Sequence, residues 1–138
     1  MATSFSKVNS FVEAVAEKVH NLGSDTLKLA FTNTSHTAGW TKLADLTLAS
    51  GAPANLDSIT LTVSSSAQTS GTYKLVIADK TCTASGAVGP FRYIYIYNDS
   101  ASNDELIGYY DYGSAVTLNN GDTFTVDFDG TNGVLTIA

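Results

Sequence analysis

The stretch "FRYIYIYND", residues 91–99, decides the fold that this sequence predicts. Side chains of an extended strand alternate between its two faces. An aromatic row is therefore expected on one face and consists of Phe91, Tyr93, Tyr95 and Tyr97. The other face is expected to carry Ile94 and Ile96 beside Arg92. A strand with one face in water needs a polar row, and this one has none, so the stretch predicts a sheet that is covered on both faces.

Short strands with alternating apolar residues surround this stretch. They are expected at 26–32, 58–64, 72–79, 106–112, 115–118, 123–128 and 133–137, with a weaker pattern at 42–49. Segments rich in Gly, Asn, Asp and Ser separate them, such as "SSSAQTSG" at 64–71, and are typical of turns. The last two strands, joined by "DGTNG" at 129–133, are predicted to form a hairpin. Short strands at this spacing favour a sandwich, jelly roll or barrel.

An amphipathic helix is predicted ahead of the strands, over residues 5–22. Its apolar stripe has the spacing of a helix face and comprises Phe5, Val8, Val12, Val15 and Val19. Gly23 follows as a stop signal. Because β-branched residues make a poor isolated helix, it is expected to form only when docked on a partner surface. The chain is thus predicted to be one domain, 1–138, with a helix at 5–22 and a jelly-roll-like β-sandwich over 24–138.

Composition excludes some classes of function. The 138 residues carry a formal net charge of -6, and the seven basic residues are scattered rather than clustered. Nucleic-acid binding by counterion release needs clustered Lys and Arg, so no nucleic-acid partner is expected. The only cysteine, Cys82, can form no intrachain disulfide, which favours synthesis in a reducing cytoplasm. The start "MATSFSK" does not resemble a secretory signal, and apolar runs are too short to span a bilayer, so no membrane association is expected.

The sequence offers no convincing catalytic constellation. His20 and His36 lie in unlike settings and neither has a third partner placed by the sequence, so a structural role is favoured. Asp111 could form a carboxylate pair with Asp127 or Asp129, but nothing fixes their separation. The prediction is therefore a protein that is not an enzyme and has no catalytic residue, metal site, cofactor or small-molecule substrate.

Two acidic loops, 98–105 and 127–133, leave an alternative open. Oxygen-rich loops can bind calcium. The second loop starts like an EF-hand, but the twelfth position from Asp127 is Ala138 rather than glutamate. Asp, Asn and Gly are also the residues that turns require. Turns are favoured, and calcium binding is left undecided.

Aromatic residues carry the stronger signal. Tyr and Trp are common at protein interfaces, where one end of the side chain stays wet. The candidate interaction residues are Phe91, Tyr93, Tyr95, Tyr97 and Trp40. Two explanations stay open for the aromatic row. Either the N-terminal helix covers it, which is favoured, or part of it contacts another subunit.

Several stretches together resemble a known family. They are "FSKVNSFVEAVAEKVHNLGSDTLKLAFTNT" (5–34), "SSSAQTSGTYKLVIAD" (64–79), "VGPFRYIYIYND" (88–99), "LIGYYDYG" (106–113) and "GDTFTVDFDGTNGVLTIA" (121–138). This pattern is similar to small virion structural proteins of tailed bacteriophages, and the likeness covers nearly the whole chain. Residues 36–57 depart from it.

The resemblance implies a capsid decoration, or cement, protein with a jelly-roll core. Such a protein would be made in the host cytoplasm and would sit on the outside of the phage head. It would bind the major capsid protein, stabilise contacts between its subunits and associate with itself as a dimer or trimer. A tail or collar protein, or a surface adhesion module that binds carbohydrate or a receptor, is the alternative. The family supplies no catalytic residues.

Overall fold

A computed structural model describes residues 4–138 and shows a mainly β protein with antiparallel sheets. Its elements are β1 (Ser6–Lys7), α1 (Phe11–Ala16), β2 (Leu27–Thr32), β3 (Val63–Thr69), β4 (Thr72–Ile77), β5 (Lys80–Thr83), β6 (Val88–Asn98), β7 (Leu106–Leu118), β8 (Thr123–Val126) and β9 (Leu135–Ile137). A 3-10 helix occupies Leu43–Asp45. Within residues 4–138, no helix is long and apolar enough to cross a membrane.

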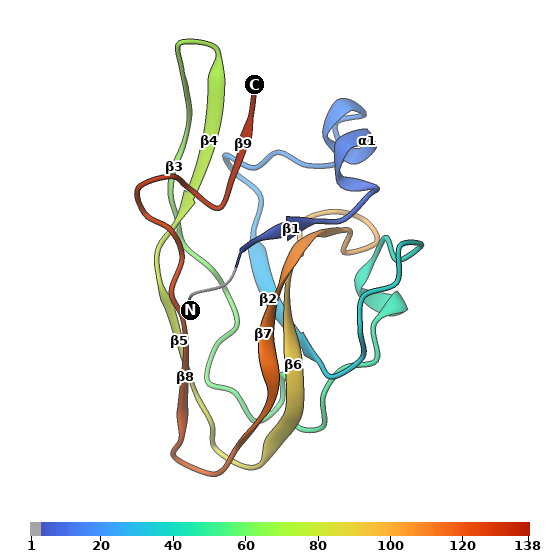
Figure 1. Ribbon diagram of the computed structural model, residues 1–138, viewed down its shortest axis with the longest axis vertical. Helices are drawn as coiled ribbons and strands as arrows, with labels where there is room; N and C mark the ends of the chain where they lie inside the picture. Colours follow the sequence, from blue (N-terminus) through green and yellow to red (C-terminus); the bar gives the residue numbers. More distant parts are fainter. Residues whose placement is uncertain (1–3) are drawn as a thin grey trace.

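The sheets lie in two layers (Figure 1). One layer is a four-stranded sheet in the order β1-β7-β6-β2. The other layer contains the sheet β3-β4-β9, and the pair β5-β8 continues it along the same side of the molecule. The strand at 88–98 therefore lies inside its sheet, between β7 and β2.

Aromatic rings join the two layers. Phe31 of β2 and Phe91 of β6 pack edge to face, with ring centroids 4.9 Å apart. The ring of Phe124, from β8 in the other layer, packs on Phe31 at 6.3 Å and on Phe91 at 5.1 Å. Edge-to-face pairs add about 0.5–1.5 kcal/mol each beyond the burial of area. The core thus lies between the β2-β6-β7 surface and β8.

The N-terminal helix is much shorter than the predicted range of 5–22. Residues Ser6–Lys7 are extended and pair with β7, and the N–H of Val8 continues this pairing by donating to the carbonyl of Ile107 at 3.1 Å. Valine has a low helix propensity because its branched Cβ loses rotamer freedom in a helix. Pairing with β7 buries Val8 completely, so the beginning of the predicted stripe forms a strand.

The helix also ends early, in a Schellman motif rather than at Gly23. Lys18 takes a left-handed conformation with φ 66°. Its N–H donates to the carbonyl of Val15 at 3.3 Å, and the N–H of Val19 donates to the carbonyl of Ala14 at 2.8 Å. These two bonds satisfy carbonyls that the last helical turn would leave free. Predicted positions 18–22 are therefore outside the helix.

The predicted hairpin at 123–137 is wrong. β8 pairs with β5, and β9 pairs with β4, so the two strands follow one another in the same direction. Residues 127–134 form a loop that departs from this common strand direction after β8 and returns to it at β9. Asp79 accepts the N–H of Phe128 at 2.9 Å, and Asp129 accepts two backbone N–H groups of its own turn. The loop is thus held by hydrogen bonds from its backbone to two carboxylates, and the chain continues in the same direction after it instead of reversing.

The region 58–71 also differs from the prediction. The expected strand at 58–64 makes an isolated bridge at Thr60 before β3 begins at Val63, and the expected turn at 64–71 is mostly β3 itself. The reversal is confined to Ser70 and Gly71, with φ 52° and 86°. Positive φ at both positions marks a two-residue type I′ turn. Small polar residues resemble a turn in the sequence, but here backbone pairing with β4 keeps them extended.

The outer edge of β2 is covered by segments that contain little regular structure. The N–H of Leu29 donates to the carbonyl of Ile59 at 2.9 Å, and that of Ala49 donates to the carbonyl of Phe31 at 2.8 Å. The weak strand pattern at 42–49 therefore corresponds to the 3-10 helix and a single bridge at Leu48.

Candidate interaction surface

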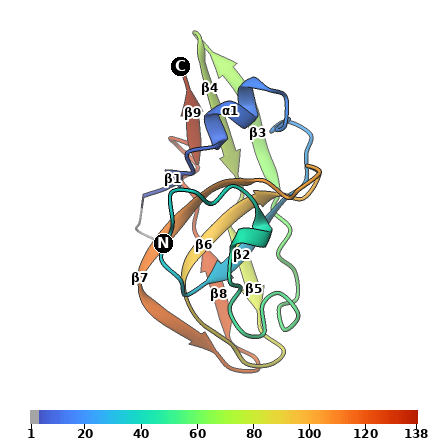
Figure 2. The ribbon, with the colours of Figure 1, turned by 90° about the vertical axis from the view of Figure 1, so that its right-hand side faces the viewer.

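The aromatic row is covered by residues 33–57, here called the covering segment. Figure 2 shows this segment in front of β6 and β2. Ser35 Oγ lies 3.0 Å from the hydroxyl of Tyr93, and His36 Nδ1 lies 2.8 Å from the hydroxyl of Tyr95. Further along, Tyr97 lines a small apolar recess with Leu43, Leu48 and other residues. The tyrosine hydroxyls and rings thus hold a long loop against the sheet.

Coverage of both strand faces is confirmed, but the expected cover is wrong. Tyr93, Tyr95 and Tyr97 are 8%, 0% and 6% exposed, and Ile94 and Ile96 are fully buried. The helix α1 does not lie over the tyrosines. It lies near β9, beyond the end of the four-stranded sheet where β1 is (Figure 1). The covering segment supplies its own polar partners for the tyrosine hydroxyls, which the valine stripe of a helix could not do.

Phe91 leaves the aromatic row. The pairing of β6 with β7 shifts between Phe91 and Tyr93, where Phe91 faces Val116 but Tyr93 faces Asp111. This bulge breaks the strict alternation of faces. Phe91 consequently packs in the inner core on Phe31 and is fully buried. The three tyrosines remain as the row.

Trp40, a candidate interaction residue, packs near Tyr95 of the row with ring centroids 6.3 Å apart and belongs to a larger aromatic cluster. We define this cluster as His36, Trp40, Tyr95 and Tyr109. His36 stacks on Tyr109 with centroids 4.6 Å apart, and Tyr109 stacks on Tyr95 at 5.1 Å. Trp40 packs edge-on against His36 at 5.8 Å. Tyr95 is buried, whereas the other three are partly exposed, so the cluster extends from the core to the surface.

His36 and Tyr109 are members that the sequence did not indicate. His36 stands in a polar loop with no periodic pattern around it. Tyr109 is one of several tyrosines in 106–112, and only its pairing opposite Tyr95 places it here. Burial lowers the pKa of His36 and raises the pKa of Tyr95. Both are therefore neutral near pH 7, and the hydroxyl of Tyr95 can donate to the unprotonated His36 Nδ1.

An ion pair lies beside the row. Arg92 Nε is 2.8 Å and Nη2 is 3.1 Å from the two carboxylate oxygens of Asp111. The guanidinium also lies 5.4 Å from the ring centre of Tyr93. The hydrogen bond from Arg92 lowers the pKa of Asp111, and hydrogen bonds from Asn132 and Thr131 lower that of Asp129. Neither carboxyl has the raised pKa that a general acid of glycoside hydrolysis needs.

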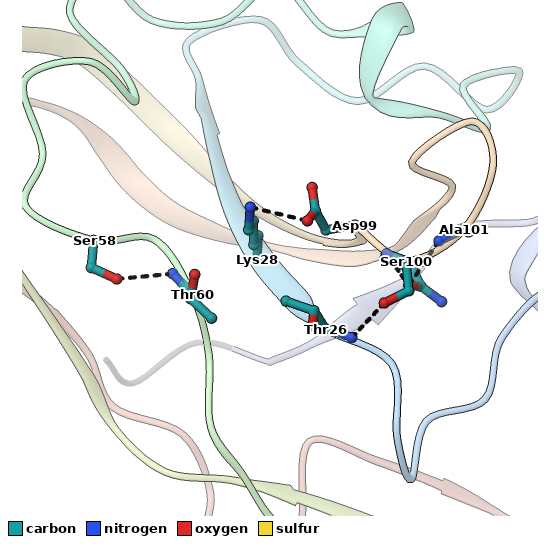
Figure 3. A network of polar contacts seen from close by, with 8 residues as sticks. Thr26, Lys28, Ser58, Thr60, Asp99, Ser100 and Ala101 are labelled. Carbon is teal, nitrogen blue, oxygen red and sulfur yellow. Dashed lines mark hydrogen bonds and ion pairs between the residues drawn. The ribbon is translucent and has the colours of Figure 1, made fainter.

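Oxygens of both acidic loops are occupied within the chain. Figure 3 shows the first loop bound to β2, with Lys28 Nζ 3.0 Å from Asp99 and the N–H of Thr26 donating to Ser100 Oγ at 2.8 Å. In the second loop Asp129 closes a turn. In the part of the chain that is described, no group of three or more His, Cys, Asp or Glu side chains is placed to hold a metal.

Cys82 is buried within the sheet region. Its Sγ lies 3.3 Å from the carbonyl of Ser58, and burial raises its pKa to about 11. The thiolate is the nucleophilic form of cysteine. A thiol with this pKa stays protonated near pH 7.

A second surface, here called the apolar groove, lies between α1 and β9. It is a recess of about 430 Å³ whose lining includes Phe11, Val12, Val15 and Ile137. Val12 is 57% exposed and Ile137 is 39% exposed. Exposed apolar side chains that share one recess mark sites of contact with other molecules more often than scattered ones do. None of these residues was singled out in the sequence as an interaction residue, because the stripe of Val12 and Val15 was expected to face the sheet.

Comparisons with known proteins return no matching family model, no matching curated protein and no matching solved structure. The resemblance to phage virion proteins therefore depends on the sequence stretches quoted above.

Proposed function

We propose that this chain is a structural protein of a tailed-phage virion that decorates the outside of the head and binds the major capsid protein. The observation that carries the proposal is the apolar groove between α1 and β9. It exposes Val12 and Ile137 on a chain of which only 14% is charged. Burying such a recess against a capsid subunit would stabilise the contact between shell subunits.

The size of the expected contact is that of an ordinary protein interface. Stable interfaces bury roughly 1,200–2,000 Å² in total. The groove alone is only the centre of such an area, and Lys7 and Thr136, the polar residues of its lining, would belong to the rim. Repetition of the same contact over a symmetric shell would add avidity. A weak single contact is therefore sufficient for stable decoration.

We further propose that the two layers form a jelly-roll-like β-sandwich. The chain crosses from one layer to the other between β2 and β3, between β5 and β6, and between β7 and β8, which supports this description. The protein would be made in the host cytoplasm and assembled onto the head, without nucleic acid, membrane, cofactor or small-molecule substrate. The proposal includes no enzymatic activity.

Cosedimentation with shells tests this function. Purified protein is mixed with phage heads that lack it and then pelleted. Val12→Asp is the informative variant, because Asp is favourable in the first turn of a helix and yet places a charge in the groove. Ala115→Asp is the matched control, since Ala115 is exposed on β7 and lies outside the groove. We expect wild type and A115D to pellet with heads and V12D to stay in solution. Absence of binding, or equal binding of V12D, would refute the proposal.

A second candidate function is a carbohydrate- or receptor-binding module on a tail or surface. The aromatic cluster favours it, because Trp40, His36 and Tyr109 are partly exposed and neighbouring rings can stack on a sugar. Trp40→Ala should abolish binding to a glycan array under this alternative. Tyr112→Ala is the control, because Tyr112 is 42% exposed and is outside the cluster. Equal glycan binding by both variants, or none by wild type, would remove this candidate.

A further inference from the structure

The outer edge of β3 is an open sheet edge. β3 is the last strand of the order β3-β4-β9 and pairs only with β4. Within residues 4–138, no other backbone segment donates to or accepts from residues 63–69. The β3-β4 hairpin also projects beyond the rest of its layer (Figure 1). An open edge is a row of backbone groups that can pair with a further strand.

The turn of the hairpin shows which backbone groups point outward. In a two-residue turn, the residues on either side of it form a hydrogen-bonded pair, here Thr69 with Thr72. Hydrogen-bonded and non-hydrogen-bonded pairs then alternate along an antiparallel ladder. Ala67 and Ser65 therefore bond to β4, whereas the N–H and carbonyl groups of Gln68 and Ser66 point to the open edge.

From Ser65 to Thr69, this edge lacks the devices that normally prevent strand addition. Proteins protect edges with charged side chains, proline, bulges or covering loops. Residues 63–69 read "VSSSAQT", with neither a charge nor a proline. A register shift occurs between Val63 and Ser65, at the beginning of the strand, and pairing is regular from Ser65 to Thr69. The outer edge of β2, by contrast, is covered, because the backbones of Leu29 and Phe31 bond to segments outside the sheet.

We propose that two copies of this chain pair through β3, antiparallel, about a two-fold axis at Ser66. Antiparallel pairing of a strand with itself is what a two-fold axis produces. Ser66 then faces Ser66 of the second copy, where the outward N–H and carbonyl groups exchange hydrogen bonds. Ser65 faces Ala67 of the second copy on the exposed face of the sheet.

The choice of a second copy follows from charge. The chain has a formal net charge of -6, so two copies repel one another on average and should pair where the contact itself adds no like charges. Like charges directly opposite in a strand pair are destabilising, whereas Ser and Thr pairs can hydrogen-bond across strands. The β3 edge is uncharged, and all its side chains except Val63 and Gln68 are Ser, Ala or Thr. Two copies that pair here therefore place no like charges directly opposite one another, and the repulsion is limited to that of their net charges.

The pairing is expected to be weak in free solution. One strand pair buries less than the roughly 1,200 Å² that marks the lower end of stable interfaces. Dimers should therefore appear only at high protein concentration. This inference does not depend on the proposed virion function, because the test uses the purified chain without any shell.

Paired charge variants test the surface and its register. Ser65→Lys combined with Ala67→Lys places lysine opposite lysine across the axis. Ser65→Lys combined with Ala67→Glu places lysine opposite glutamate in the same register. Sedimentation velocity up to about 1 mM covers the range of weak dimers. We expect wild type to dimerise, the Lys/Lys variant to bind at least tenfold more weakly, and the Lys/Glu variant to bind as tightly as wild type or more tightly.

A backbone variant gives an independent readout. Gln68→Pro removes an outward N–H and leaves the ladder to β4 intact, since proline is tolerated on the open side of an edge strand. It should lose dimerisation while retaining the circular dichroism spectrum of wild type. A monomeric wild type at 1 mM, or equal dimerisation of the Lys/Lys and Lys/Glu variants, overturns the proposal. Protection of the β3 edge by a capsid subunit, in place of a second copy, would also overturn the proposal.

Discussion

Lys18 shows how one residue can set the end of a helix at a cost. Its φ of 66° lies in the left-handed region, and this conformation costs a residue that has a Cβ roughly 1–2 kcal/mol. Glycine takes this conformation without a Cβ clash, although it adds entropy to the unfolded chain. We expect Lys18→Gly to be more stable than Lys18→Ala by about 1 kcal/mol in urea unfolding. Both variants lose the same charge, so the comparison isolates the backbone. Equal stability would contradict the Schellman assignment.

His20 occupies a buried polar network whose protons can be assigned. The amide oxygen of Asn98 accepts the backbone N–H groups of Ser100 and Ala101. Its Nδ2 must therefore donate, to Asp25 at 2.6 Å and to His20 Nδ1 at 3.0 Å. The ring proton of His20 is then on Nε2, which has no hydrogen-bond partner among the described residues. Protonation of Nδ1 would break the bond from Asn98.

This network predicts how stability depends on pH. Burial lowers the pKa of His20 and His36 below 6.5, although Glu105 and Asp25 partly oppose this for His20. The unfolded chain therefore binds more protons than the folded one as the pH falls through 6.5. The free energy of unfolding should be highest above pH 6.5 and should decrease toward pH 5, by at most about 1.4 kcal/mol per pH unit for each histidine.

Urea titrations at pH 8, 7, 6 and 5 check this dependence. His20→Gln should flatten the curve between pH 7 and 5, because it removes the buried group that resists protonation. Carboxyl groups whose pKa is lowered, such as that of Asp111, lose their contribution to stability only at lower pH, as the pH falls below the ordinary carboxyl pKa of 3.8. An increase in stability from pH 7 to 5, or an unchanged slope in the variant, would show that the histidines are not buried in the neutral form.

The β1 strand depends on a glycine in its neighbour, which is an effect at the scale of elements. Lys7 of β1 pairs opposite Gly108 of β7. A Cβ at Gly108 would overlap the Phe5 ring and lie 2.5 Å from the carbonyl oxygen of Ser6. We expect Gly108→Ala to displace β1 and to destabilise the protein by about 1–3 kcal/mol, the range for overpacking.

Hydrogen exchange at the Val8 amide reports this displacement, because that N–H bonds to the carbonyl of Ile107. Gly130→Ala is the control, since a Cβ at Gly130 meets nothing within 4 Å. It should change the free energy of unfolding by less than about 0.5 kcal/mol. Unchanged protection of Val8 in G108A would mean that β1 does not need the close approach of the two backbones.

The positions of strands were predictable from the sequence where apolar and polar side chains alternate. Which strands pair with one another was not predictable. The alternation in 26–32, 72–79 and 123–128 located β2, β4 and β8. β8 pairs with β5 rather than β9, and the carboxylates of Asp79 and Asp129 bind backbone N–H groups of the loop that follows β8. A turn-rich stretch such as "DFDGTNG" has the same composition whether the chain reverses or continues. The stripe of valines similarly fits a helix by spacing, while Val8 is buried in β pairing.

At the scale of the whole molecule, the tyrosine row predicted a cover but not its identity. The alternating tyrosines and isoleucines of β6 showed that both faces are buried. The covering segment has no periodicity, because its role is fulfilled by single contacts such as Ser35 with Tyr93 and His36 with Tyr95. The apolar groove was not predictable for a related reason. The Val12 side of α1 faces a recess beside β9 instead of the sheet.

Trp40 allows the cooperativity of the whole molecule to be measured. It is the only tryptophan and belongs to the covering segment, with its ring centroid 6.3 Å from that of Tyr95. Because Tyr95 is fully buried under this segment, release of the segment would expose the core strand β6. We therefore expect Trp40 fluorescence and far-ultraviolet circular dichroism to give coincident urea transitions, as for a two-state domain. Tyr95→Phe should shift both transitions together to lower urea, by about 0.5–1.5 kcal/mol for the lost hydrogen bond. A fluorescence transition that precedes the loss of β structure would show that the covering segment is a separate unit, and that the tyrosine row can be uncovered for a partner while the sheets stay folded.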